Sequence, residues 1–192
     1  MKVLIACEES QTECKAFREN GHLAFSCDIQ KCSGGKPEWH IQRDCISVIK
    51  DSLSEWDLII AHPPCTYLSR VSSAALSQGK HLPEQIAEAK EFFMFFYGLP
   101  GRVCIENPVP IAKIGLPAYN QIVQPYQFGD NWTKQTCLWL KNLPPLIPLC
   151  YAPYGKTRNC APSWVAHKCG SKARSKSFTG IARAMATQWQ FD

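Results

Sequence analysis

Two short segments of the chain carry side chains that could act together in nucleophilic catalysis. Cys65 directly follows Pro63 and Pro64 at the end of an apolar run. Two consecutive prolines fix the backbone and remove two N–H donors, so such a turn can hold a small nucleophile in one pose, and the thiolate is the reactive form of cysteine. Glu106 and Asn107 end another apolar run, where the carboxyl group could donate a proton to a ring nitrogen. The simpler alternative is a thiol that fills a turn and a carboxylate that is solvated.

The elements that must position these residues alternate along the chain. We predict strands over residues 2–7, 22–29, 57–62, 102–108 and 134–140, and helices over 11–21, 44–56, 82–99 and 180–189. This alternation is typical of an α/β protein, with a parallel sheet covered by helices on both faces. Ligands of such sheets bind outside the carboxyl ends of the strands. Several chemically capable residues are therefore expected at one edge of the sheet: Cys7, Glu8, Glu9, Asp28, Asp44, Cys65, Glu106 and Asn107.

Asp28 ends the second predicted strand, about 20 residues after the loop of the first. In nucleotide-binding α/β folds an acid at this position binds the ribose hydroxyls of an adenosine ligand. The loop after the first strand, "ACEESQ", contains no glycine. A conventional dinucleotide site, which uses a glycine-rich loop there, is therefore not expected.

Composition places the chain among globular proteins of one domain, spanning residues 1–192. Of its 192 residues 45% are hydrophobic and 19% charged, which is unlike a disordered chain. No apolar run reaches the roughly 18–20 residues of a membrane span, and the N-terminus lacks the pattern of a signal peptide. A cytoplasmic location is expected; the bacterial host cell is what the resemblance described below implies. The chain contains 11 cysteines, which is an odd number, so we expect reduced thiols rather than a disulfide framework.

The net charge of +5 is unevenly distributed. Residues 131–191 contain no Asp or Glu, and the basic side chains gathered there indicate an anionic partner; a solvated basic face is the alternative. This segment could bind phosphates whatever the base sequence, with Trp132, Trp139, Tyr154 and Trp164 stacking on bases or packing in the core. The candidate substrate-binding residues are Lys134, Lys172, Arg174 and Lys176.

A second group of residues has the chemistry of a zinc site. Cys150, Cys160, His167 and Cys169 lie in a proline-rich segment where a metal could take the place of a core. Their spacing matches no common zinc motif. The leading expectation is therefore that no metal is bound.

Two motifs resemble those of a known enzyme family. "DLIIAHPPCTYLS" (57–69) and "VCIENPVP" (103–110) are similar to the fourth and sixth motifs of the cytosine-C5 DNA methyltransferases. The segments "NWTKQTCLWLKNLPPL" (131–146) and "SKSFTGIARAMATQW" (175–189) resemble those of short phage- or prophage-encoded members. The resemblance runs in order from Val3 to Trp189.

The resemblance implies a Rossmann-like, class I methyltransferase sheet that binds S-adenosylmethionine. It also implies that Cys65 attacks C6 of cytosine while Glu106, paired with Asn107, protonates or hydrogen-bonds N3. The methyl group then passes to C5, after which the C5 proton and the thiol leave. The cofactor contacts that the resemblance implies are Ala6, Cys7, Glu8, Glu9, Asp28, Ile29, Asp44, Cys45 and Pro64, and the "SFTGIAR" turn could close the methionine end.

The chain departs from the family in three places. The glycine-rich first motif is replaced by "CEES", and the strand that usually carries a supporting arginine reads "TKQTCLWL", where Lys134 or Lys141 could supply a cation. The chain also lacks a sizeable target-recognition domain. We therefore expect DNA that is single-stranded or read with little sequence preference, or a protein partner that supplies recognition. Two alternatives remain open: a catalytically idle nucleic-acid- or protein-binding module, and an enzyme that modifies free cytosine nucleotides.

Overall fold

The computed structural model describes residues 1–70, 78–79, 82–149 and 176–191. Within these ranges the chain forms a seven-stranded sheet with the strand order β3-β2-β1-β4-β5-β7-β6. Strand β7 runs antiparallel to its neighbours β5 and β6, and the other pairs are parallel. The strands are β1 (Lys2–Ala6), β2 (Leu23–Asp28), β3 (His40–Gln42), β4 (Leu58–Ala61), β5 (Val103–Pro108), β6 (Gln121–Val123) and β7 (Thr136–Lys141).

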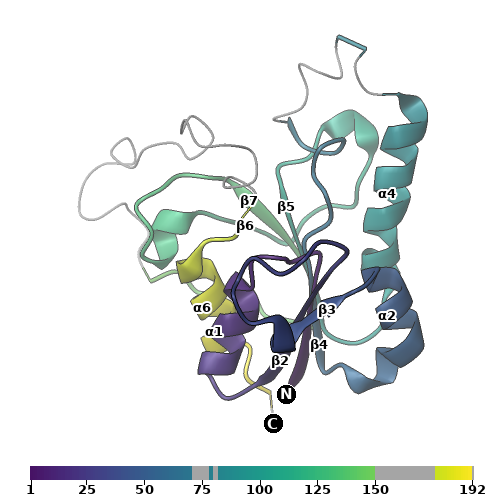
Figure 1. Cartoon of the computed structure of the whole chain (residues 1–192). Helices are drawn as coiled ribbons and strands as arrows, with labels where there is room; N and C mark the ends of the chain where they lie inside the picture. Colours follow the sequence, from purple (N-terminus) through teal and green to yellow (C-terminus); the bar gives the residue numbers. More distant parts are fainter. Residues whose placement is uncertain (71–77, 80–81, 150–175, 192) are drawn as a thin grey trace.

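Helices cover both faces of the sheet (Figure 1). One face packs against α1 (Thr12–Glu19) and α6 (Thr179–Gln188), and the other against α2 (Cys45–Ser52) and α4 (Pro83–Gly98). The predicted fold class, an α/β Rossmann-like sheet with helices on both faces, is confirmed. Short 3₁₀ helices lie at Pro37–Trp39, Leu53–Glu55, Ala112–Ile114 and Pro125–Phe128.

The central strands are apolar throughout because both of their faces are covered. In β1, Val3 and Ile5 belong to the core beneath α1 and α6, whereas Leu4 and Ala6 belong to the core beneath α2 and α4. The alternation of side chains along a strand produces this division. Because it continues past the strand ends, it also decides on which side of the sheet each site residue lies.

The structure differs from the predicted elements in three respects. Strands β3 and β6 have three residues each and were not predicted, because such short segments carry no detectable hydrophobic period. The sheet is mixed rather than parallel, since β7 enters it antiparallel between β5 and β6. The predicted helix over 44–56 is divided into α2 and the 3₁₀ turn Leu53–Glu55.

Two predicted helix ends agree with the structure. Asp44 caps α2 by accepting a 2.9 Å hydrogen bond from the backbone N–H of Ser47, and Gly21 after α1 adopts a positive φ of 81°, as a residue beyond a helix end often does. In the described part of the chain, no helix combines the length and apolarity needed to cross a membrane.

Candidate active site

The turn that carries Cys65 is fixed on both of its sides. Asn107 on β5 donates a 2.7 Å hydrogen bond from Nδ2 to the backbone oxygen of Pro63. The backbone oxygen of Cys65 accepts hydrogen bonds from the N–H groups of Leu68 (3.1 Å) and Ser69 (3.0 Å). The half-buried thiol is therefore held on a turn that is tied to the neighbouring strand.

A second set of contacts joins the two motifs beyond this turn. The N–H of Ile111 donates to the oxygen of Leu68 at 2.8 Å, and the N–H of Arg70 donates to the oxygen of Val109 at 2.9 Å. The chain that follows Cys65 thus runs beside the chain that follows β5, and the two predicted motifs form one unit.

Glu106 lies on the α1 side of the sheet and Asn107 on the α4 side. Glu106 pairs with Leu138 of one core, and Asn107 with Cys137 of the other. Asn107 is buried, and its Oδ1 has no hydrogen-bond partner among the described residues. The two side chains therefore lie on opposite faces of the sheet, and Asn107 braces the turn.

The carboxylate of Glu106 is stabilised by its surroundings. Its Oε2 lies 2.8 Å from Nδ1 of His62. Burial raises the pKa of Glu106, but the hydrogen bond from His62, the charge of Lys134 and a hydrogen bond from Thr136 together hold that pKa below its usual value. An isolated carboxyl group in such a buried place would be neutral, so these neighbours determine its charge.

The thiol of Cys65 is affected in the opposite direction. Burial and then the negative charge of Glu106 raise the pKa of Cys65, while Lys134 and a hydrogen bond with Ser69 oppose the rise. The resting state is therefore a thiol near a carboxylate. A change that neutralises Glu106 favours the thiolate.

The antiparallel direction of β7 brings Lys134 to this edge. Lys134 precedes the first residue of β7, and its charge acts on Cys65, His62 and Glu106. Lys141 lies at the other end of β7, where its Nζ donates a 2.6 Å hydrogen bond to the backbone oxygen of Leu99. Of the two lysines considered for the supporting cation, the structure brings Lys134 to the site.

The loop after β1 turns one of its acids inward. Glu8 is 4% exposed, and its carboxyl group accepts hydrogen bonds from the N–H groups of Glu13 (2.8 Å) and Cys14 (3.4 Å) at the start of α1. Burial, followed by the charge of Glu13, raises the pKa of Glu8 well above its usual value. The neighbouring Glu9 has a buried Oε2 with no hydrogen-bond partner in the described part of the chain.

Two cysteines meet beside this loop. Cys7 follows the buried Ala6 and has a positive φ of 61°, and its Sγ lies 3.6 Å from Sγ of Cys45 at the start of α2. The hydrogen bond between the two thiols, together with burial, raises the pKa of Cys7, whereas the same bond lowers the pKa of Cys45. Of the two thiols, Cys7 therefore holds its proton more firmly.

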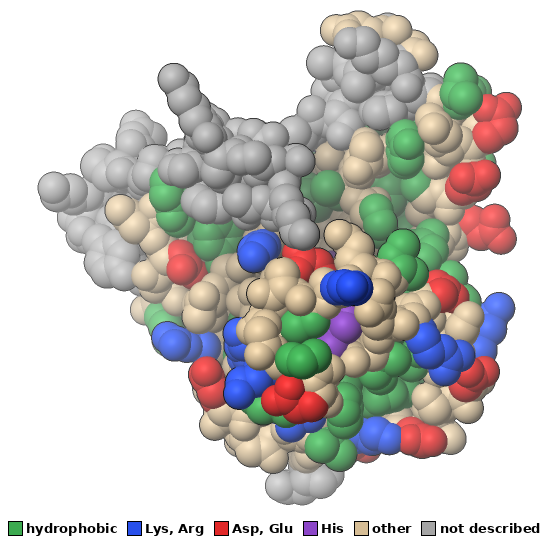
Figure 2. Space-filling model, viewed as in Figure 1, with side chains coloured by type: hydrophobic (Ala, Val, Ile, Leu, Met, Phe, Trp, Pro, Cys, Tyr) green, Lys and Arg blue, Asp and Glu red, His purple; other side chains and the backbone are tan. Residues whose placement is uncertain are grey.

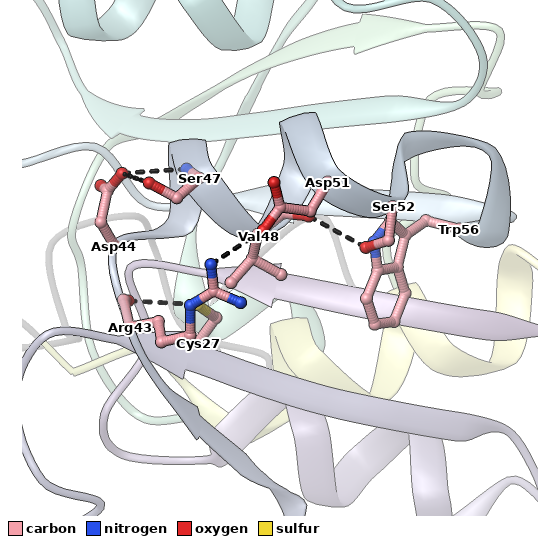
Figure 3. A network of polar contacts seen from close by, with 8 residues as sticks. All are labelled: Cys27, Arg43, Asp44, Ser47, Val48, Asp51, Ser52 and Trp56. Carbon is pink, nitrogen blue, oxygen red and sulfur yellow. Dashed lines mark hydrogen bonds and ion pairs between the residues drawn. The ribbon is translucent and has the colours of Figure 1, made fainter.

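The remaining predicted cofactor residues lie along the ends of β2 and α2. Oδ1 of Asp28 accepts a 2.8 Å hydrogen bond from the N–H of Gln30, and the side chain of Ile29 is 72% exposed. Asp44 caps α2 through Ser47, as Figure 3 shows next to the ion pair of Arg43 and Asp51. Cys27, also drawn there, donates from Sγ to the oxygen of Arg43 at 3.4 Å, and burial raises its pKa to about 12.

The structure does not describe every predicted residue. Pro64 and Lys176 are exposed. Lys172 and Arg174 lie outside the described residues, as do the zinc candidates Cys150, Cys160, His167 and Cys169. Among the residues that are described, no group of three or more His, Cys, Asp or Glu side chains is arranged to hold a metal ion.

Sequence reasoning missed His62, Glu13 and Thr136. His62 stands directly before the two prolines, and this adjacency was the signal that could have revealed it. Glu13 is 1% exposed; in the sequence it stands three and four residues before Ala16 and Phe17, on the apolar face of the helix, and this position was the corresponding signal. Thr136 gave no signal, because threonine is common in strands.

Charges are mixed on the face of the molecule that Figure 2 shows. Lys and Arg side chains alternate there with Asp and Glu. Acidic side chains follow the outer side of α4 in the same view, where Glu84, Glu88 and Glu91 are exposed. A polyanion would therefore be repelled from the outer side of α4.

No protein-family model and no curated protein matches the chain. Among the solved structures that match is the crystal structure of a candidate DNA modification methyltransferase encoded within a prophage of E. coli. The two share 13% sequence identity with a TM-score of 0.47, over 73% of this chain and 46% of that protein, so this chain spans about half the length of the protein it matches. The class of fold is established independently of this likeness, by the strand order of the sheet.

Proposed function

We propose that the protein is a DNA methyltransferase that transfers a methyl group from S-adenosylmethionine to C5 of cytosine through a covalent adduct of Cys65. The observation that carries this proposal is the pairing of a half-buried thiol with a buried carboxylate at the carboxyl edge of the sheet. The charge of Glu106 acts on Cys65, and Asn107, next to Glu106, fixes the turn on which Cys65 stands.

This pair has the protons that the first step requires. The proton of the Cys65 thiol passes to Glu106 as sulfur bonds to C6 of the ring. Glu106 gives a proton to N3, so that the ring gains sulfur at C6 and hydrogen at N3 and becomes nucleophilic at C5. After methylation, a water molecule takes the proton from C5 and the bond from C6 to sulfur breaks with its electron pair on sulfur. N3 returns its proton to Glu106, from which it passes back to the thiolate of Cys65. Nucleophile and acid thus divide one difficult reaction into easier steps.

The segments that follow β1 and β2 offer groups that fit S-adenosylmethionine, whose sulfonium would supply the methyl group. A partly exposed carboxylate, Asp28, stands where ribose hydroxyls are bound in related folds, beside the exposed apolar surface of Ile29. The buried Oε2 of Glu9 has no partner within the described residues and would suit an ammonium group. Asp44 and the backbone of Cys45 would complete the adenine side.

Charge supports a nucleic acid as the substrate. The acid-free segment 131–191 begins beside the site at Lys134, and Lys176, Lys172 and Arg174 lie farther along it. The acidic outer side of α4 would direct phosphates away from that helix. We propose single-stranded DNA, or duplex DNA read with little sequence preference, with a protein partner as the source of any stricter recognition.

The test is methyl transfer from labelled S-adenosylmethionine to duplex DNA, single-stranded DNA, RNA and dCTP, each offered separately. We expect label in DNA with the wild type and none with Cys65→Ala or Cys65→Ser, although both variants still bind the cofactor. An oligonucleotide with 5-fluorocytosine should trap a covalent complex whose mass locates the bond at Cys65.

Other outcomes lead to other functions. Label only in dCTP would identify a nucleotide-modifying enzyme, and label in RNA would change the class of substrate. Cofactor binding without transfer to any substrate would contradict a self-sufficient enzyme. If the protein neither binds the cofactor nor transfers a methyl group, a binding module on the same fold is the function that remains.

A further inference from the structure

A buried row of ionisable side chains leads from the start of α1 to Glu106. Glu8 shares a side-chain hydrogen bond with Glu13, whose Oε1 lies 3.6 Å from Nε2 of His62. On the other side of the imidazole ring, Nδ1 of His62 lies 2.8 Å from Oε2 of Glu106. The side chains of Glu13, His62 and Glu106 are only 1%, 12% and 14% exposed. The carboxyl group proposed for catalysis is therefore one end of an internal row.

The geometry favours the charged form of the imidazole. Nδ1 of His62 is hydrogen-bonded to Glu106, whereas Nε2 has no hydrogen-bond partner among the described residues and faces Oε1 of Glu13 at the ion-pair distance of 3.6 Å. Only the imidazolium form has a proton to direct at each of these oxygens. A neutral ring would turn a lone pair toward one of the two carboxylates. The electrostatics agree: burial lowers the pKa of His62, but the charges of Glu13 and Glu106 and the hydrogen bond with Glu106 outweigh burial and raise it.

We propose that His62 is a positioning residue for Glu106: held between Glu13 and Glu106, its imidazolium fixes one carboxylate oxygen of Glu106 and strengthens that residue as a proton donor. The inference rests on the proposed function. N3 of cytosine is a weak base, and a weakly basic atom needs a donor that releases its proton readily. A buried carboxyl group by itself holds its proton firmly. The imidazolium of His62 lowers the pKa of Glu106 and so makes this carboxyl group a stronger proton donor.

Glu13 has a separate part in the arrangement. It comes from α1, a different element from the β4 turn and from β5, and its carboxylate is the second counter-charge that keeps His62 protonated. Lys134 opposes it, because its charge lowers the pKa of His62. The titratable and charged groups around the imidazole are Glu8 in the loop after β1, Glu13 on α1, Cys65 on the turn, Cys104 and Glu106 on β5, and Lys134 before β7.

The first test measures the charge of His62 without any reaction. The chain has five histidines, and the imidazole signals of His62 in a nitrogen-15 NMR spectrum are those lost in His62→Gln. We expect the midpoint of their titration to lie above about 6.5, the usual histidine value. Glu13→Gln and Glu106→Gln should each lower this midpoint. The matched control is Glu19→Gln, an exposed acid at the end of the same helix, which should leave it unchanged.

The second test measures the effect on catalysis. With His62→Gln we expect kcat for methyl transfer to fall by roughly 10- to 100-fold, within the range that general acid catalysis contributes. The Kd of S-adenosylmethionine should not change, because His62 lies on the Glu106 side of the row. Circular dichroism checks that the variants fold, and Glu13→Gln, which replaces one atom, serves if His62→Gln does not.

The outcomes separate this inference from the proposed function. A midpoint at or below the usual value, or one that Glu13→Gln leaves in place, overturns the role of His62 even if methyl transfer is observed. A raised midpoint that Glu13→Gln lowers, in a wild type that transfers no methyl group to any substrate, retains the charged row and contradicts the proposed function. A His62→Gln variant with unchanged kcat also overturns the inference.

Discussion

Asn107 on β5 donates a 2.7 Å hydrogen bond to the backbone oxygen of Pro63, so the turn that presents Cys65 is fastened to the strand that presents Glu106. The two motifs are far apart in the sequence, and this side chain is the contact between them that lies nearest to Cys65. Removing it should therefore affect stability and activity together.

Asn107→Ala leaves the oxygen of Pro63 without its partner in a buried place. Losing such a bond costs about 1–3 kcal/mol, which lowers the Tm of a chain of this size by about 2–4 °C for each kcal/mol. We expect kcat to fall further than stability alone explains. Asn20→Ala is the control, because Nδ2 of Asn20 donates to the oxygen of Ala16 at 2.9 Å away from the site. Equal kcat values in the two variants would contradict the bracing role.

Reactivity of Cys65 should follow the charge of Glu106. Burial and Glu106 raise the pKa of the thiol, so alkylation of Cys65 by iodoacetamide should be slow at neutral pH and accelerate as the pH rises. Glu106→Gln removes the negative charge and should lower the pKa, which increases the alkylation rate at pH 8. Mass spectrometry of the peptide that contains Cys65 measures this rate. A slower reaction in Glu106→Gln would show that the carboxylate acts as a base instead.

Glu8 should make the protein less stable as the pH rises. Its pKa in the folded state is raised well above the usual value, first by burial and then by Glu13, whereas the unfolded chain releases this proton at about pH 4.3. Above that pH the folded state holds a proton that the unfolded state has lost. The free energy of unfolding therefore falls with increasing pH, by at most about 1.4 kcal/mol per pH unit for one proton.

Glu8→Gln keeps an oxygen for the N–H groups of α1 but cannot titrate, so its stability should exceed that of the wild type increasingly between pH 5 and pH 8. Urea denaturation at several pH values measures the difference. The exposed Glu19→Gln should run parallel to the wild type. A Glu8→Gln curve that is also parallel would show that Glu8 is ionised in the folded protein.

Gly34 should tolerate no side chain. A Cβ atom there would lie 2.5 Å from the oxygen of Ser10 and 2.6 Å from Cβ of Gln11. The buried Gln11 holds this loop by donating a 2.7 Å bond to the oxygen of Lys36. Gly34→Ala should lower the free energy of unfolding by about 1–3 kcal/mol, as overpacking usually does. Gly98→Ala, with no atom within 4 Å of the added carbon, should not. Similar Tm values for both variants would contradict the close contact.

Much of the fold could be predicted from the sequence because its central strands are continuous apolar runs. The strands β1, β4 and β5, and the long helix α4, were predicted where they occur. The place of β7 could not be predicted, since its direction depends on how the chain returns to the sheet rather than on the residues of Thr136–Lys141. That direction is what brings Lys134, rather than Lys141, to the site.

Only the site residues that belong to the two motifs could be predicted from the sequence. Cys65 and Glu106 were found because proline or an acid interrupts an apolar strand. His62 and Glu13 were not, since their roles depend on contacts between three elements that lie far apart in the sequence. The role of a buried ionisable residue can be recognised only when the residue that it contacts is known. Whether Asp28, Glu9 and Asp44 contact a cofactor stays a prediction.

The inward turn of Glu8 has a consequence for the kind of nucleotide that this fold can accept. In many α/β proteins the first N–H groups of such a helix bind the phosphates of a nucleotide. Here the N–H groups of Glu13 and Cys14 already bind the carboxyl group of Glu8. A ligand with a pyrophosphate, such as a dinucleotide or a nucleoside triphosphate, would find its usual anchor filled by a side chain of the protein itself. A ligand that carries no phosphate would not need this anchor.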